Sequence, residues 1–103
     1  MKIIESKEEN HCLSIEVHVT RLDAASARDF KKECDDLWNN GIQSITVNLA
    51  IVEFIDSSGV GALLSLYKRL PASNPSVKLL QVRPTVQAVI ELLRLHRIFE
   101  IIP

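Results

Sequence analysis

The residues best suited to chemistry cluster in one stretch, Asp56 to Gly61, which reads D-S-S-G-V-G. It places a carboxylate, two hydroxyls and two glycines within six positions. A serine hydroxyl either accepts a transferred group or, when a histidine base activates it, attacks as a nucleophile. The serine-hydrolase pattern Gly-x-Ser-x-Gly does not occur here. The three histidines of the chain, which could serve as a base, all lie far from the stretch in sequence: His11, His18 and His96. The pattern therefore argues against a catalytic serine.

The flanking residues predict that this stretch is a turn from a strand into a helix. Residues 44–49 alternate between polar and apolar side chains, as a half-buried strand does. After the turn, apolar residues recur at the spacing of a helix face: Val60, Leu63, Leu64 and Tyr67. The first helical turn has unpaired amides, which Asp56, Ser57 or Ser58 can cap, and it favours an anion. These residues alone leave a capped helix and a functional site equally open.

The rest of the chain shows the periodicities of a small α/β domain. Residues 12–19 alternate between polar and apolar side chains and are predicted to form a strand with one solvent-exposed face. Residues 77–82 are predicted to form another strand, and residues 98–102 a short final edge strand. Residues 5–9 are predicted to be a turn, and residues 71–76 a loop. Asp23 is predicted to cap a helix with an apolar stripe: Ala24, Ala27, Phe30, Cys34, Leu37 and Trp38. Pro84 is predicted to begin the last helix.

This order of elements implies parallel crossovers and helices mainly on one side of a sheet. Loops at the carboxyl ends of parallel strands gather on one edge, so we expect Asp23 to lie near the turn at Asp56.

The composition and charge of the chain indicate the number of domains and the classes of partner to expect. The 103 residues are 47% apolar, which fits a single domain over residues 1–103. Twelve basic and 13 acidic residues give a net charge of −1, so neither nucleic acid nor an anionic membrane is an expected partner. No apolar run is long enough for membrane insertion, and we expect a cytoplasmic protein. Cys12 and Cys34 lack metal-ligand spacing, and His18 is expected to be a surface residue.

The D-S-S-G-V-G turn, preceded by Val47-Asn48-Leu49 and Phe54-Ile55, closely resembles the STAS domain of the anti-sigma factor antagonist family. Leu22-Asp23 and the helix start Gln81-Val82-Arg83-Pro84 fall in the family's order. The resemblance implies a mixed sheet of four to five strands flanked by three to four helices, mainly on one face. It also implies a protein that is not an enzyme, with no cofactor and no metal.

The resemblance assigns roles to the turn. Ser57 corresponds to the serine that accepts a phosphoryl group from a partner serine kinase of the anti-sigma type, and a phosphatase resets it. Asp23 and Asp56 correspond to the bordering acidic residues, and Ser58, Gly59 and Gly61 complete the partner-binding turn. Gly59 and Gly61 are expected to let a partner approach the backbone closely.

The implied function is a binding switch in transcription regulation. The unphosphorylated protein docks on the kinase and frees a client, and the phosphorylated protein is released. The alternative is a constitutive adaptor or scaffold, in a regulatory or transport assembly, that is not phosphorylated. Two departures from the family pattern keep this alternative open, because Thr20 and Arg94 stand where glycine is usual.

Overall fold

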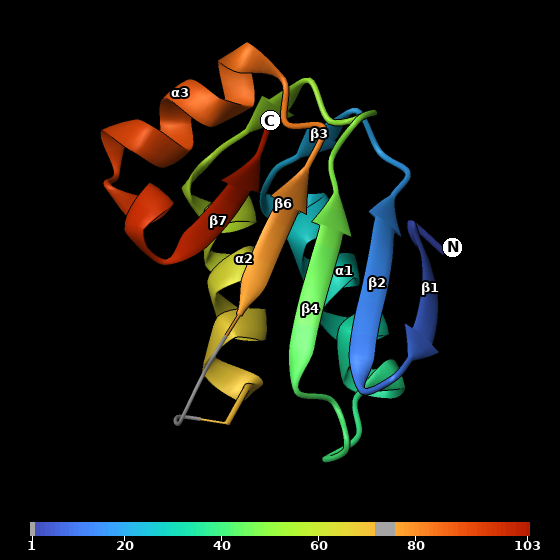
Figure 1. The fold of residues 1–103 in the computed structure, drawn as a ribbon. Coiled ribbons are helices and arrows are strands. Elements are labelled where there is room, and N and C mark those ends of the chain that lie inside the picture. The colour runs from blue at the N-terminus through green and yellow to red at the C-terminus, as the bar shows by residue number, and fades with distance from the viewer. Residues whose placement is uncertain (1, 72–75) are drawn as a thin grey trace.

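The computed structural model describes residues 2–71 and 76–103, and its centre is a mixed five-stranded sheet (Figure 1). The strand order is β1-β2-β4-β6-β7. β1 pairs antiparallel with β2, and every other neighbouring pair is parallel. The strands are β1 (Ile4–Glu9), β2 (Cys12–Val17), β4 (Ser44–Asn48), β6 (Val77–Leu80) and β7 (Phe99–Ile102). The mixed sheet and the final edge strand are as predicted.

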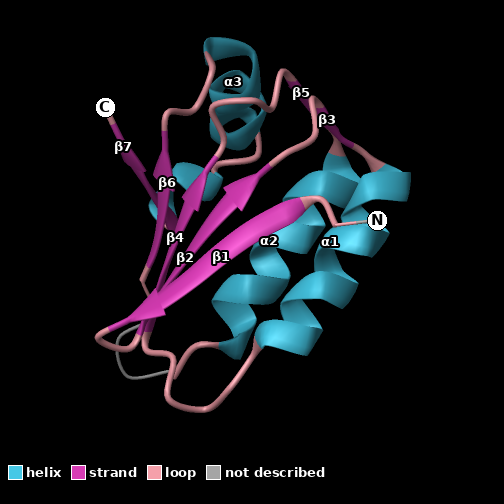
Figure 2. Ribbon diagram, turned by 90° about the vertical axis from the view of Figure 1, so that its right-hand side faces the viewer, coloured by secondary structure: helices cyan, strands magenta, loops and turns pink. Residues whose placement is uncertain are grey.

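The two longest helices cover one face of this sheet. α1 (Ala24–Leu37) and α2 (Ser57–Arg69) lie side by side on it, whereas α3 (Pro84–Leu92) lies near the carboxyl ends of the strands (Figure 2). A short 3-10 turn, η1 (Leu95–Arg97), follows α3. Pro84 begins α3 as predicted. Within the described residues, no helix is both long and apolar enough to cross a bilayer.

The core lies between the sheet and the helices α1 and α2. Alternate residues of the central strands are buried there, together with the inward stripe of each helix. Members include Ile15, Val17, Ile45, Val47, Phe30, Cys34, Leu63 and Leu66. Each large apolar side chain that is fully buried in this way stabilises the fold by about 1.5–3 kcal/mol.

The prediction of a turn over residues 5–9 is wrong. These residues belong to β1, and the turn lies at Asn10 and His11, whose φ angles are 52° and 65°. Two consecutive positive φ angles are the signature of a type I′ hairpin turn. β1 is an edge strand whose side chains beyond Ile4 are all exposed, so its sequence carries no alternation. Pairing with β2 alone defines it as a strand.

A second, two-stranded sheet escaped the sequence analysis. β3 (Arg21–Leu22) and β5 (Phe54–Ile55) pair in parallel, with Leu22 opposite Ile55. Two residues are too few to show a period. Each of these strands leads directly into a helix, β3 into α1 and β5 into α2. Of the predicted loop 71–76, residues 72–75 lie outside the described residues.

Candidate functional site

Asp56 is the N-cap of α2. Its backbone is extended, with φ of −116°, and its Oδ1 accepts hydrogen bonds from the amides of Ser58 (2.9 Å) and Gly59 (3.1 Å). This is the arrangement that satisfies the unpaired donors of a first helical turn. Of the three residues able to cap this helix, the carboxylate is the one that does so. Both serine hydroxyls are therefore spared that structural task.

Ser57 is the first residue of α2 and is exposed, whereas Ser58 is half-buried. Among the described residues, no hydrogen bond involves the Ser57 hydroxyl, and none links a histidine to either serine. An exposed hydroxyl without an internal partner is accessible to a second protein.

Asp23 caps α1 in a reciprocal arrangement with Ser26. Ser26 donates its amide to Asp23 Oδ1 (3.3 Å), and the Asp23 amide donates to Ser26 Oγ (3.0 Å). The pKa of Asp23 is lowered from its ordinary value of 3.8, chiefly because the Ser26 amide donates to the carboxylate. Ser26 was not among the site residues predicted from the sequence. A serine three residues after a capping aspartate was the available signal, although Glu or Gln is the usual residue there.

The pairing of β3 with β5 brings the two caps together. Leu22 and Ile55 are opposite each other, and the Asp56 amide donates to the Leu22 carbonyl (3.4 Å). Asp23 and Asp56 follow these two residues directly, and neighbouring strands run about 4.8 Å apart. The amino ends of α1 and α2 thus lie side by side, each capped by one carboxylate, Asp23 on α1 and Asp56 on α2. Sequence distance had separated these residues by more than 30 positions.

Gly59 is required by the packing inside the chain. A Cβ atom at this position would lie 2.1 Å from the Leu22 carbonyl oxygen and 2.7 Å from Ile55 Cγ1. Inside the chain, the close neighbour of Gly59 is therefore β3. At Gly61, no atom of the described residues lies within 4 Å of the position a Cβ would take. Only the second glycine leaves room beside the backbone.

Two further residues that the sequence analysis had given no role lie at this site. Arg21 and Phe54 are register partners, and the Arg21 Cζ atom lies 4.0 Å from the centroid of the Phe54 ring. The Arg21 Nε atom is also 3.7 Å from Asp23 Oδ2. Phe54 remains 39% exposed, an uncommon exposure for so large an apolar side chain. A cation and an aromatic ring thus stand on the surface beside the two carboxylates.

The loop before β5 is held from two sides. The Thr20 carbonyl accepts hydrogen bonds from the amides of Glu53 (2.7 Å) and Phe54 (3.1 Å). From the start of α3, Arg83 Nε donates to the Ala50 carbonyl (2.8 Å) and Thr85 Oγ1 donates to the Glu53 carbonyl (3.0 Å). Thr20 is not among the residues with positive φ, so this position does not need the glycine that is usual in the family.

Arg94, the other position where the family usually has glycine, does have a backbone conformation that favours glycine. Its φ is 59° and its ψ is 27°, the left-handed conformation that glycine adopts most easily. It follows the end of α3, where glycine commonly terminates a helix.

Comparison with known proteins identifies the fold. The family model of the STAS domain matches residues 4–103. A STAS domain protein from Planctomyces limnophilus is similar with a TM-score of 0.85 at 18% identity, over 99% of this chain and 90% of that one. A putative anti-sigma factor antagonist from Thermotoga maritima is similar with a TM-score of 0.78 at 27% identity, over 95% and 84%.

A third structure is that of the Bacillus cell fate determinant SpoIIAA in its phosphorylated form. It superposes with a TM-score of 0.71 at 20% identity, over 97% of this chain and 91% of that one. Its likeness to this chain is a likeness of fold. Since the family model spans nearly the whole sequence, the chain belongs to the STAS domain family.

Proposed function

We propose that this protein is an anti-sigma factor antagonist, a non-catalytic binding protein controlled by phosphorylation of Ser57. One observation carries the proposal. Ser57 presents an exposed hydroxyl, without a hydrogen bond to any other described residue, at the first position of α2, beside the capping carboxylate of Asp56. A phosphoacceptor needs only an accessible hydroxyl held in place, because the kinase supplies the nucleotide, the metal and the base. The proposed partners are a serine kinase of the anti-sigma type and a phosphatase.

Phosphorylation acts mainly on binding in this proposal. A phosphate adds about −1.5 to −2 charges, next to Asp56 and near Asp23. The amino end of α2 stabilises an exposed anion by only about 0.3–1 kcal/mol. Burying the same charge unpaired in an interface costs on the order of 3 kcal/mol, which lowers affinity roughly a hundredfold. The loss of partner binding therefore outweighs the gain within the fold.

Arg21 and Phe54 extend the proposed docking surface. Aromatic residues and arginine are enriched in the centres of protein interfaces, where they contribute much of the binding energy. Here they stack on each other at the surface, beside Asp23. A kinase that approaches the Ser57 hydroxyl meets this pair on the neighbouring strands. We propose that the pair contributes affinity while Ser57 is the residue that switches it.

The test is the intact mass of the protein after incubation with ATP and the serine kinase encoded nearest to it. We expect a gain of one phosphate, lost in Ser57→Ala and kept in Ser58→Ala. The Ser58 variant is a matched control because its amide still donates to Asp56. Phosphate incorporation that persists in Ser57→Ala would refute the assignment of the site.

Binding is measured separately, by titrating the kinase without ATP. We expect Ser57→Ala to bind as the unmodified protein does and Ser57→Asp to bind roughly a hundredfold more weakly. A stable complex that gains no phosphate, and that Ser57→Asp leaves intact, would instead support the constitutive adaptor.

A further inference from the structure

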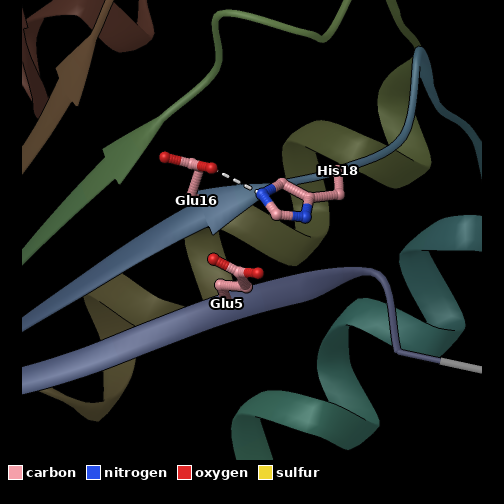
Figure 3. A group of neighbouring side chains, drawn as sticks. All are labelled: Glu5, Glu16 and His18. Atoms are coloured by element: carbon pink, nitrogen blue, oxygen red, sulfur yellow. Dashed lines mark hydrogen bonds and ion pairs between the residues drawn. The ribbon is translucent and has the colours of Figure 1, made fainter.

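Three side chains of metal-ligand type converge on the sheet face opposite to α1 and α2. They are Glu5 of β1, Glu16 of β2 and His18, two residues further along, and Figure 3 shows them pointing toward one another. One ligand atom from each lies within 4.8 Å of the other two. All three residues are exposed, so an ion can reach them from solvent. The group lies on different strands from the Ser57 turn and does not depend on its function.

The backbone already holds these three residues in position. Glu5 and Glu16 are direct partners in the antiparallel ladder between β1 and β2. The His18 amide continues this pairing beyond the end of β2, since it donates to the Ile3 carbonyl (2.7 Å). Residues 16 and 18 are two apart and so project from the same face of the sheet. Only side-chain torsions remain to be ordered when an ion binds.

The charges at this place are unbalanced. Carboxylates directly opposite each other on two strands destabilise the pair. Glu16 Oε1 contacts His18 Nε2 at 2.5 Å, but no ion pair among the described residues involves Glu5. The lysine two residues along β1, Lys7, lies 3.6 Å from Glu9 instead. A cation between Glu5 and Glu16 would remove this repulsion.

There is also space for the remaining ligands of an ion. A shallow cavity of about 310 Å³ borders Glu5 and Glu16, and its polar lining includes Ser14, Thr46 and Asn48. Its openness to solvent allows water to complete a coordination shell, as happens in sites with three protein ligands.

We propose that Glu5, Glu16 and His18 form a three-ligand site for a divalent transition-metal ion, with Zn²⁺ as its representative. Imidazole nitrogen with carboxylate oxygen suits Zn²⁺, Cu²⁺ and Ni²⁺, whereas Mg²⁺ and Ca²⁺ prefer oxygen alone. Tetrahedral zinc with bonds of about 2.0 Å needs ligand atoms about 3.3 Å apart. Exposed side chains reach this spacing by rotation, and His18 Nε2 then exchanges Glu16 for the metal.

The experiment is a titration of the full chain with Zn²⁺ at about pH 7.5. The half-buried Cys12 is itself able to bind zinc, so every variant carries Cys12→Ser. We expect one Zn²⁺ per chain, with affinity lowered more than about tenfold by His18→Asn and by Glu5→Gln. Loss of an outer-shell partner alone costs 10- to 100-fold, and loss of a ligand costs at least as much.

His11→Asn is the matched control, since His11 is exposed at the opposite end of β2, where its Nδ1 contacts the Gly41 carbonyl (3.1 Å). We expect this variant to keep its zinc affinity, and millimolar Mg²⁺ not to compete. Zinc should also raise the melting temperature of the parent by more than that of His18→Asn at the same zinc concentration. Binding that is absent, or that His18→Asn and Glu5→Gln do not weaken, or that Mg²⁺ displaces, would overturn the proposal.

Discussion

The two glycines of the Ser57 turn offer a direct test of how the site is built. Gly59 and Gly61 lie two residues apart in α2, and neither has a positive φ. An alanine at Gly59 would place its Cβ 2.1 Å from the Leu22 carbonyl oxygen. Real Cβ contacts are not shorter than 3.0 Å, so α2 must move at least about 0.9 Å away from β3. Leu22 is fully buried and its carbonyl is backbone, so β3 yields little.

Two opposing effects determine how much each substitution changes the free energy of unfolding: overpacking against neighbouring atoms and the helix propensity of the new residue. Overpacking of this kind costs about 1–3 kcal/mol, and a clash with rigid backbone belongs at the upper end. Replacing glycine by alanine inside a helix stabilises the helix by about 1 kcal/mol, because alanine has the higher helix propensity. We therefore expect Gly59→Ala to lower the free energy of unfolding by about 2 kcal/mol. The new Cβ of Gly61→Ala meets no atom of the described part of the chain within 4 Å, so this variant should raise the free energy of unfolding by about 0.5–1 kcal/mol.

Urea unfolding followed by circular dichroism measures both changes, and thermal unfolding checks them. For a domain of this size, 1 kcal/mol corresponds to about 4 °C in the melting temperature. The Gly59 variant should thus melt about 8 °C below the parent and the Gly61 variant a few degrees above it. Equal stability of the two variants would refute the argument that Gly59 is an internal packing requirement.

Three other predictions concern single residues. Arg94→Gly should raise the free energy of unfolding by about 1 kcal/mol, because Arg94 occupies the left-handed conformation with φ of 59°. Urea denaturation measures this change, and an unchanged urea midpoint would contradict it. Asp23→Asn should be less stable than the parent near pH 7, because the lowered pKa of Asp23 shows that folding favours its charged form. That contribution is present above the ordinary value of 3.8 and is lost as the pH falls through the lowered pKa, so the two melting temperatures should converge in acid. A thiol reagent near pH 8 should label one cysteine per folded chain, Cys12, because burial raises the pKa of Cys34 to about 12; rapid labelling of two would show that Cys34 is accessible.

Local chemistry determined most of the elements around the site. The alternation in residues 12–19 and 44–49 follows from the two-residue period of a strand with one buried face, and the strands are present as Cys12–Val17 and Ser44–Asn48. Asp23 and Asp56 cap α1 and α2, since a short side chain ending in a carboxylate satisfies the first amides of a helix wherever the helix lies. Such features depend on neighbours in sequence, and a pattern therefore predicts them.

Contacts between distant residues were decided only by the tertiary structure. β1 is a strand because β2 pairs with it, although its own side chains are almost all exposed. The pairing of Leu22 with Ile55 sets Asp23 beside Asp56, and the same approach leaves no room for a side chain at Gly59. The meeting of Glu5 with Glu16 likewise depends on strand register. Register is a property of two segments at once, so no period within either segment encodes it.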